Sequence, residues 1–115
     1  MTGASRHQRN RAQGIAFIYV VKCGWDVKVG FTFDVKARIS QIQNANSRRV
    51  RIIREYELPA DVARTAERGA HELRSSYRIR GEWFRAPPDV IERAIDLAIL
   101  RARGEPWPER KLITV

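Results

Sequence analysis

The chain has 115 residues, 43% of them hydrophobic, which gives room for one ordinary folded domain and little more. It has no apolar run near the roughly 20 residues that a membrane span needs, and a single cysteine with two scattered histidines makes no zinc site. Lysine and arginine outnumber the acidic residues by 22 to 13, and a net charge of +9 favours a polyanionic partner. The polar N-terminus lacks the apolar core of a signal peptide, so we expect a cytoplasmic protein.

The first segment, residues 1–14, contains no acidic residue and almost nothing to bury. This composition predicts a disordered basic arm that precedes the folded domain. The arginines of this arm, which we expect to contact phosphate groups, are Arg6, Arg9 and Arg11.

A β-hairpin is predicted next. Residues 15–21 form a short apolar run rich in β-branched and aromatic side chains, which is typical of a buried strand. Residues 23–26 supply turn residues, and residues 27–31 alternate as a half-buried partner strand does. A helix then begins after Asp34, a suitable N-cap, and ends within residues 44–47.

The middle of the chain predicts a third strand and a second helix. Residues 50–58 alternate, with an apolar face that comprises Val50, Ile52, Tyr56 and Leu58. Pro59 and Asp61 open the helix. Its apolar stripe comprises Val62, Ala66, Ala70, Leu73 and Tyr77.

A third helix is predicted from residues 87–89 to about Arg103, with Gly104 as its stop. Between Val90 and Leu100 it is apolar over much of its surface, more than a small sheet needs, so it is a candidate surface for a homodimer. Residues 105–115 predict an irregular C-terminal tail.

The order β-β-α-β-α-α predicts an α+β fold, in which a small antiparallel three-stranded sheet is flanked by helices. We therefore expect a basic arm over residues 1–14, one domain over residues 15–104 and a tail over residues 105–115.

Five short motifs in order point to a family. They are Phe17-Ile18-Tyr19, Lys28-Val29-Gly30, Arg38, Ala66-Glu67-Arg68 with His71, and Gly81-Glu82-Trp83-Phe84. Together they resemble the GIY-YIG nuclease family, and the last resembles a phage-associated branch described as a DNA-binding domain. Two positions depart from the pattern, because Phe17 replaces the first glycine and Lys28 replaces a tyrosine.

The resemblance implies a GIY-YIG-like fold and a Mg²⁺- or Mn²⁺-dependent endonuclease that hydrolyses DNA phosphodiesters. The catalytic residues it implies are Tyr19, Lys28, Arg38, Glu67 and His71, with Glu67 as the metal ligand. Tyr19 would take a proton from water, although a free phenol has a pKa of about 10. We expect the Lys28 ammonium to lower that pKa, Arg38 to meet a phosphate, and His71 to be a partner of Glu67 or a phosphate contact rather than a metal ligand.

A basic stretch between residues 36 and 54 contains no acidic residue. Beside a phosphodiesterase site it predicts a groove that follows the DNA backbone with weak sequence specificity. The residues expected to line it, together with the three arginines of the arm, are Lys36, Arg48, Arg49, Arg51 and Arg54.

Two other functions stay open at this point. The same fold can grip DNA without cutting it, since a fold does not determine an activity. The chain can also be a basic accessory protein that oligomerises through its third helix. Each charged candidate residue also has an ordinary interpretation as a solvent-exposed charge beside a helix or strand core.

Overall fold

The computed structural model describes residues 5–104. Its helices are α1 (Arg6–Ala12), α2 (Val35–Asn44), α3 (Ala60–Leu73) and α4 (Pro88–Ala102). Its strands are β1 (Ile15–Cys23), β2 (Asp26–Thr32), β3 (Arg51–Pro59), β4 (Arg78–Arg80) and β5 (Trp83–Phe84).

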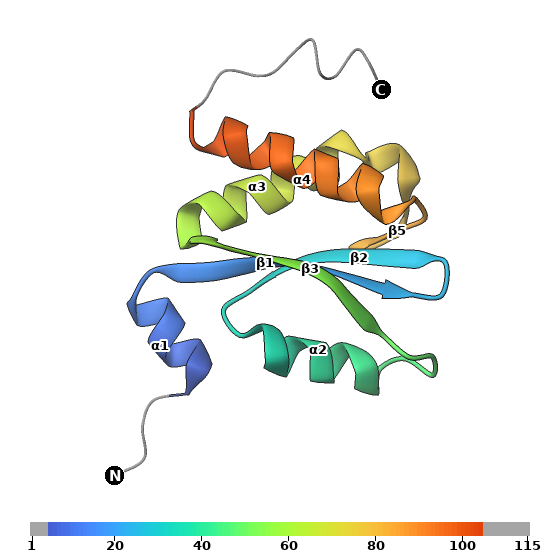
Figure 1. The fold of residues 1–115 in the computed structure, drawn as a ribbon, viewed down its shortest axis with the longest axis horizontal. Helices are drawn as coiled ribbons and strands as arrows, with labels where there is room; N and C mark the ends of the chain where they lie inside the picture. Colours follow the sequence, from blue (N-terminus) through green and yellow to red (C-terminus); the bar gives the residue numbers. More distant parts are fainter. Residues whose placement is uncertain (1–4, 105–115) are drawn as a thin grey trace.

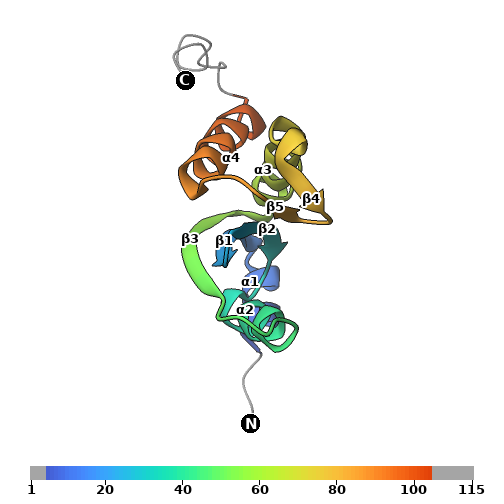
Figure 2. The same cartoon turned by 90° about the vertical axis from the view of Figure 1, so that its right-hand side faces the viewer.

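These elements form three layers (Figure 1). The middle layer is an antiparallel sheet with the strand order β3-β1-β2-β5-β4. Helices α3 and α4 cover one face, and α1 and α2 lie on the other (Figures 1 and 2). The predicted α+β class is confirmed, but the described sheet has five strands instead of three.

The segment predicted as a disordered arm forms helix α1. The Ser5 side chain accepts a hydrogen bond from the Gln8 backbone N–H at 3.1 Å, and the Gln8 side chain accepts one from the Ser5 backbone N–H at 2.9 Å. Such a capping box satisfies backbone donors that a helix start leaves open. Asn10 ties the helix to the domain by donating to the Phe33 carbonyl at 2.6 Å. The prediction of disorder rested on composition and did not take this local capping signal into account. Residues 1–4 of the predicted arm lie outside the described residues.

The predicted hairpin and the helix that follows it are confirmed. Strands β1 and β2 pair from Phe17 opposite Thr32 to Cys23 opposite Asp26. Asp34 caps α2, because its Oδ1 accepts a hydrogen bond from the Ala37 backbone N–H at 3.1 Å.

A bulge in β3 overturns part of the predicted strand face. The pairing of β3 with β1 shifts at Ile53, which is left without an opposite residue. Because a bulge re-aims the side chains on either side of it, Val50 packs under α2, whereas Tyr56 and Leu58 pack under α3 and α4. Ile52 is 45% exposed, so the expectation that these apolar residues share one face is wrong.

Two short strands follow α3. The helix ends at Leu73, and Tyr77 falls in a 3₁₀ turn with its side chain exposed, so it is not part of the helix stripe. Gly81, with φ +53°, makes the turn between β4 and β5, and β5 pairs with β2. Strands this short carry no alternation, which is why the sequence did not predict them.

Two clusters of buried side chains hold the layers together. The larger lies between the sheet and the pair α3 and α4, and the smaller lies between the sheet and α2. Helix α4 contributes to the larger cluster with Ile91, Ala94, Ile95, Ala98 and Ile99. Much of the apolar surface of α4 is thus covered within the chain. No helix in the described part is long and apolar enough to span a membrane, and the predicted tail, residues 105–115, lies outside the described residues.

Candidate functional site

Tyr19 of β1 is fully buried in the small cluster under α2. Its cross-strand neighbour in β2 is Gly30. A Cβ atom placed on Gly30 would overlap the ring and hydroxyl of Tyr19, so the phenol lies directly over the glycine. Gly30 is therefore needed to let the Tyr19 side chain cross β2.

Three side chains that can ligate a cation meet nearby. Glu67 and His71 lie one turn apart on α3, and Glu82 lies between β4 and β5. One ligand atom from each falls within 4.8 Å of the others, and all three side chains are partly buried. Glu82 belongs to the Gly81–Phe84 motif but was not among the site residues predicted from the sequence. In the same motif, Phe84 is buried in the larger cluster and Trp83 packs partly buried against the smaller.

His71 is held as a partner of Glu67. Its Nε2 lies 3.2 Å from Glu67 Oε2 and 3.0 Å from the Val29 carbonyl oxygen. Both neighbours are acceptors, so we assign the proton to Nε2. Burial is the largest influence and lowers the pKa of His71, but the hydrogen bonds to Glu67 and Val29 outweigh it and raise that pKa. This arrangement orients the Glu67 carboxylate, in line with the role expected for His71.

The Tyr19 hydroxyl lies within electrostatic reach of Arg38 and of both carboxylates. Burial is the main cause that raises the pKa of Tyr19, and Glu82 and Glu67 add to it. The half-buried Arg38 of α2 opposes this effect, because a nearby cation favours the phenolate. The neutral hydroxyl has no hydrogen-bond partner among the described residues. Arg38 lowers its pKa first as a hydrogen-bonding side chain that favours the phenolate and second as a nearby charge.

Lys28 lies on β2, the strand that pairs with the Tyr19 strand, as expected. Its Nζ lies 3.2 Å from Glu82 Oε1 and 5.4 Å from the centre of the Trp83 ring. The largest influences on the pKa of Tyr19 are burial, Arg38, Glu82 and Glu67. Lys28 is thus paired with Glu82, and Arg38 is a cation that lowers the pKa of the Tyr19 phenol. The role expected of Lys28 toward that phenol stays a prediction.

One group of the predicted DNA-contacting residues lies where α1 meets the start of α2. Arg6 and Arg9 of α1 and Lys36 of α2 line a common hollow there. The guanidinium of Arg11 lies 5.5 Å from the centre of the Phe33 ring, which faces the same helix.

The remaining predicted residues lie at the other end of α2 and on β3 (Figure 1). Arg48, Arg49 and Arg51 are exposed. Arg54 is engaged within the protein, because its Nη1 lies 3.3 Å from Glu92 Oε1 and its guanidinium lies 4.4 Å from the centre of the Tyr56 ring. The structure thus distributes the predicted groove over two separate basic surfaces.

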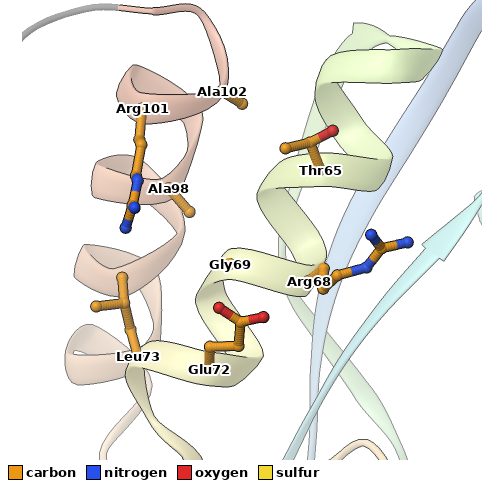
Figure 3. Close-up of a pocket in the computed structure, with 8 residues that line it drawn as sticks. All are labelled: Thr65, Arg68, Gly69, Glu72, Leu73, Ala98, Arg101 and Ala102. Carbon is orange, nitrogen blue, oxygen red and sulfur yellow. The ribbon is translucent and has the colours of Figure 1, made fainter.

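A hollow between α3 and α4 lies away from these polar groups. Thr65, Arg68, Gly69 and Glu72 line it from α3, and Ala98 lines it from α4 (Figure 3). At 100° per residue these positions of α3 point away from the side that carries Glu67 and His71. The hollow is a product of helix packing and adds no group to the polar site.

The chain is a small α+β domain with a buried tyrosine beside two carboxylates, a histidine and an arginine. A family model, that of the T5orf172 domain, matches residues 16–99. The chain belongs to the T5orf172 domain family. This finding corrects the assignment to the GIY-YIG nucleases that the sequence motifs suggested. No curated protein and no solved structure matches the chain.

Proposed function

We propose that this protein is a metal-dependent endonuclease that hydrolyses phosphodiester bonds in DNA. The observation that carries the proposal is the convergence of Tyr19, Arg38, Glu67 and Glu82 from four separate segments at one place. A buried phenol whose pKa is changed by burial and by nearby charged side chains is characteristic of functional sites. The net charge of +9 supports a polyanionic substrate.

The residues present fit a small divalent cation. Carboxylate oxygens are the ligands that Mg²⁺ and Mn²⁺ prefer, and Glu67 and Glu82 offer them close together. Each carboxylate is held by a neighbour, since Lys28 Nζ lies 3.2 Å from Glu82 Oε1 and His71 Nε2 lies 3.2 Å from Glu67 Oε2. A cation bound there would supply positive charge for the oxygen that leaves phosphorus.

Tyr19, Arg38 and His71 have the other roles in the proposed reaction. Tyr19, as phenolate, takes the proton from the water whose oxygen attacks phosphorus, while the bond from phosphorus to the leaving oxygen breaks. Arg38 favours that phenolate and stabilises negative charge on the phosphate. His71 holds Glu67 in place. Because burial keeps the pKa of Tyr19 high, we expect the rate to rise with pH through the neutral range.

A second function, DNA binding without cleavage, is favoured by one observation. The Tyr19 hydroxyl is buried, so water reaches it only if neighbouring side chains move. In that case the polar cluster is a structural element, and the basic surfaces carry the whole function.

Incubation with supercoiled plasmid separates the two functions. The nuclease proposal predicts nicked and linear DNA with Mg²⁺ or Mn²⁺ and none with a chelator. Intact DNA under all three conditions, together with a shifted DNA band in a gel, would leave binding as the function. A matched RNA in the same assay checks the choice of DNA, since cleavage of RNA alone would contradict it.

A further inference from the structure

Trp25 is exposed at the tip of the β1–β2 hairpin without a structural reason. Its side chain is 79% exposed, the largest fraction for a large hydrophobic residue in the described chain. Cys23 pairs with Asp26, which leaves Gly24 and Trp25 as the two turn residues. Gly24 has φ +62°, and no described non-glycine residue has a positive φ, which is the pattern of a type II′ turn. That turn requires the glycine but makes no demand for an aromatic residue after it.

Two hollows flank Trp25, and basic side chains line both. The first, about 470 Å³, is lined by Lys22, Trp25 and Arg85, with Ala86, Pro87 and Pro88 beside them, and its volume is in the range of about 300–1,000 Å³ for small-molecule sites. The second is lined by Trp25, Arg48 and Arg85 together with Asp26 and neighbouring polar residues. The indole is therefore accessible from two sides.

The charge around the indole suits a phosphate chain. Asp26 is paired with Arg85, whose Nη2 lies 3.0 Å from Asp26 Oδ1, so Lys22 and Arg48 leave this surface with excess positive charge. The guanidinium of Arg48 lies against the turn, because a Cβ atom on Gly24 would come within 2.7 Å of Arg48 Nη1. An aromatic face flanked by basic side chains is the arrangement that binds single-stranded nucleic acid.

We propose that Trp25 stacks on one unpaired base of a DNA strand, while Lys22 and Arg48 contact its phosphates. This inference rests on the proposed function for the choice of DNA. A base inside a duplex is covered by its neighbours, whereas an unpaired base exposes a flat face to the indole. The substrate class is therefore DNA with a single-stranded segment beside the bond that is cut.

The position of Trp25 in the turn just before β2 fits this substrate. Lys28 of β2, which is paired with Glu82, follows the turn residue Trp25 by three positions. At about 3.3 Å per residue the two are about 10 Å apart. A stacked strand with about 3.4 Å per nucleotide covers that distance in roughly three nucleotides. A base on Trp25 would thus place a phosphate a few nucleotides away at the polar site.

Fluorescence anisotropy with labelled oligothymidine and with a blunt duplex tests the stacking. Trp25→Ala should weaken oligothymidine binding by about 5- to 150-fold, the effect of losing one base–aromatic stack, and should leave duplex binding within about twofold. Trp25→Phe should retain most of the affinity. The matched control is Ile79→Ala, which removes another exposed apolar side chain and should change neither affinity. Equal oligothymidine affinity in Trp25→Ala, or equal losses on both probes, would overturn the proposal.

An abasic probe isolates the base from the phosphates. In an oligothymidine with scattered abasic sites the phosphates remain, so the wild type should bind it more weakly than the intact strand, and Trp25→Ala should bind both equally. Discrimination that persists in Trp25→Ala would contradict the assignment. A wild type that binds through Trp25 but cuts no DNA would leave the stacking site intact and refute the nuclease, so the two failures are distinguishable.

Discussion

The two faces of the sheet bury different kinds of side chain. Under α3 and α4 lies the larger cluster, in which aliphatic side chains pack against alanines such as Ala66 and Ala98. Under α2 lies the smaller cluster, and its largest buried side chain is Tyr19. Arg38 on α2 and the carboxylates of Glu67 and Glu82 lie within electrostatic reach of that tyrosine.

This difference indicates that the face under α3 and α4 mainly stabilises the fold, whereas the face under α2 holds the candidate site. The larger cluster can supply most of the stability, because it buries many more apolar side chains than the smaller one. It also buries one hydroxyl without a hydrogen-bond partner, that of Tyr56. The smaller face can then tolerate a buried hydroxyl without a hydrogen-bond partner, which costs stability and is typical of a functional position. The following predictions test that difference, from the largest expected effect to the smallest.

Truncation in the larger cluster should be the most destabilising change. Ile95→Ala, at a fully buried position in α4, should lower the free energy of unfolding by about 2–5 kcal/mol, because it leaves a cavity between α4 and the sheet. Ile42→Ala removes the same atoms under α2, at the edge of the smaller cluster, and should cost less. Urea denaturation of both variants measures the difference. A larger loss of unfolding free energy in Ile42→Ala than in Ile95→Ala would contradict the claim that the larger cluster supplies most of the stability.

Gly30→Ala should be destabilising as well. The added methyl group collides with Tyr19, and overpacking of this kind costs about 1–3 kcal/mol. The matched control is Gly69→Ala on α3, where the new Cβ would lie 3.4 Å from Ala98 Cβ, an ordinary contact. There the better helix propensity of alanine should stabilise by up to about 1 kcal/mol. Thermal melting compares the two, and similar melting temperatures would show that Tyr19 does not lie over Gly30.

The hollow shared by α1 and α2 should contribute to DNA affinity through charge alone. Replacing Arg6 and Lys36 by Gln should reduce the slope of log affinity against log salt by about 2, since each phosphate contact contributes about 0.9. Arg54→Gln is the control, because Arg54 is already paired with Glu92, and it should change the slope less. A slope that is unchanged in the double variant would exclude this surface from DNA binding.

Alkaline pH should weaken the fold slightly through Tyr56. Burial is the main cause that raises the pKa of Tyr56 above its ordinary value of about 10. A group whose pKa is higher in the folded state stabilises fully below its unfolded pKa, and that stability is lost as pH rises above about 10. Tyr56→Phe should therefore lose less stability than the wild type between pH 9 and about 10.5 in urea titrations. Parallel losses would show that the Tyr56 phenol ionises equally in both states.

The sequence predicted the elements whose signals are local and strong. The β1–β2 hairpin, the Asp34 cap and the start of α4 follow from apolar runs, a capping residue and paired prolines. The bulge at Ile53 and the β4–β5 hairpin were missed because both arise from pairing with distant strands. Helix α1 was missed because the basic, acid-free composition of residues 1–14 predicts disorder, whereas the Ser5–Gln8 capping box is a local helix signal.

The candidate site was anticipated in part. Four of the predicted site residues lie close together in the structure, namely Tyr19, Arg38, Glu67 and His71. The motifs that pointed to them also suggested the GIY-YIG nucleases, and the family assignment was corrected to the T5orf172 domain family. Glu82 was overlooked, since only the fold of β5 against β2 places it beside Lys28. The pairing of Lys28 with Glu82 was not anticipated, because it depends on side-chain packing that spacing does not reveal. The role expected of Lys28 toward the Tyr19 phenol stays a prediction.

The central claim is that the polar cluster beside Tyr19 cuts DNA, and cleavage of plasmid by Glu67→Gln and Tyr19→Phe tests it most directly. Both variants keep the size of the side chain, so they should fold and bind DNA as the wild type does. We predict that each loses cleavage by at least about 100-fold, the cost of removing one group that acts in the transition state. Circular dichroism and gel shifts confirm fold and binding. Nicking by both folded variants at the wild-type rate would contradict the account.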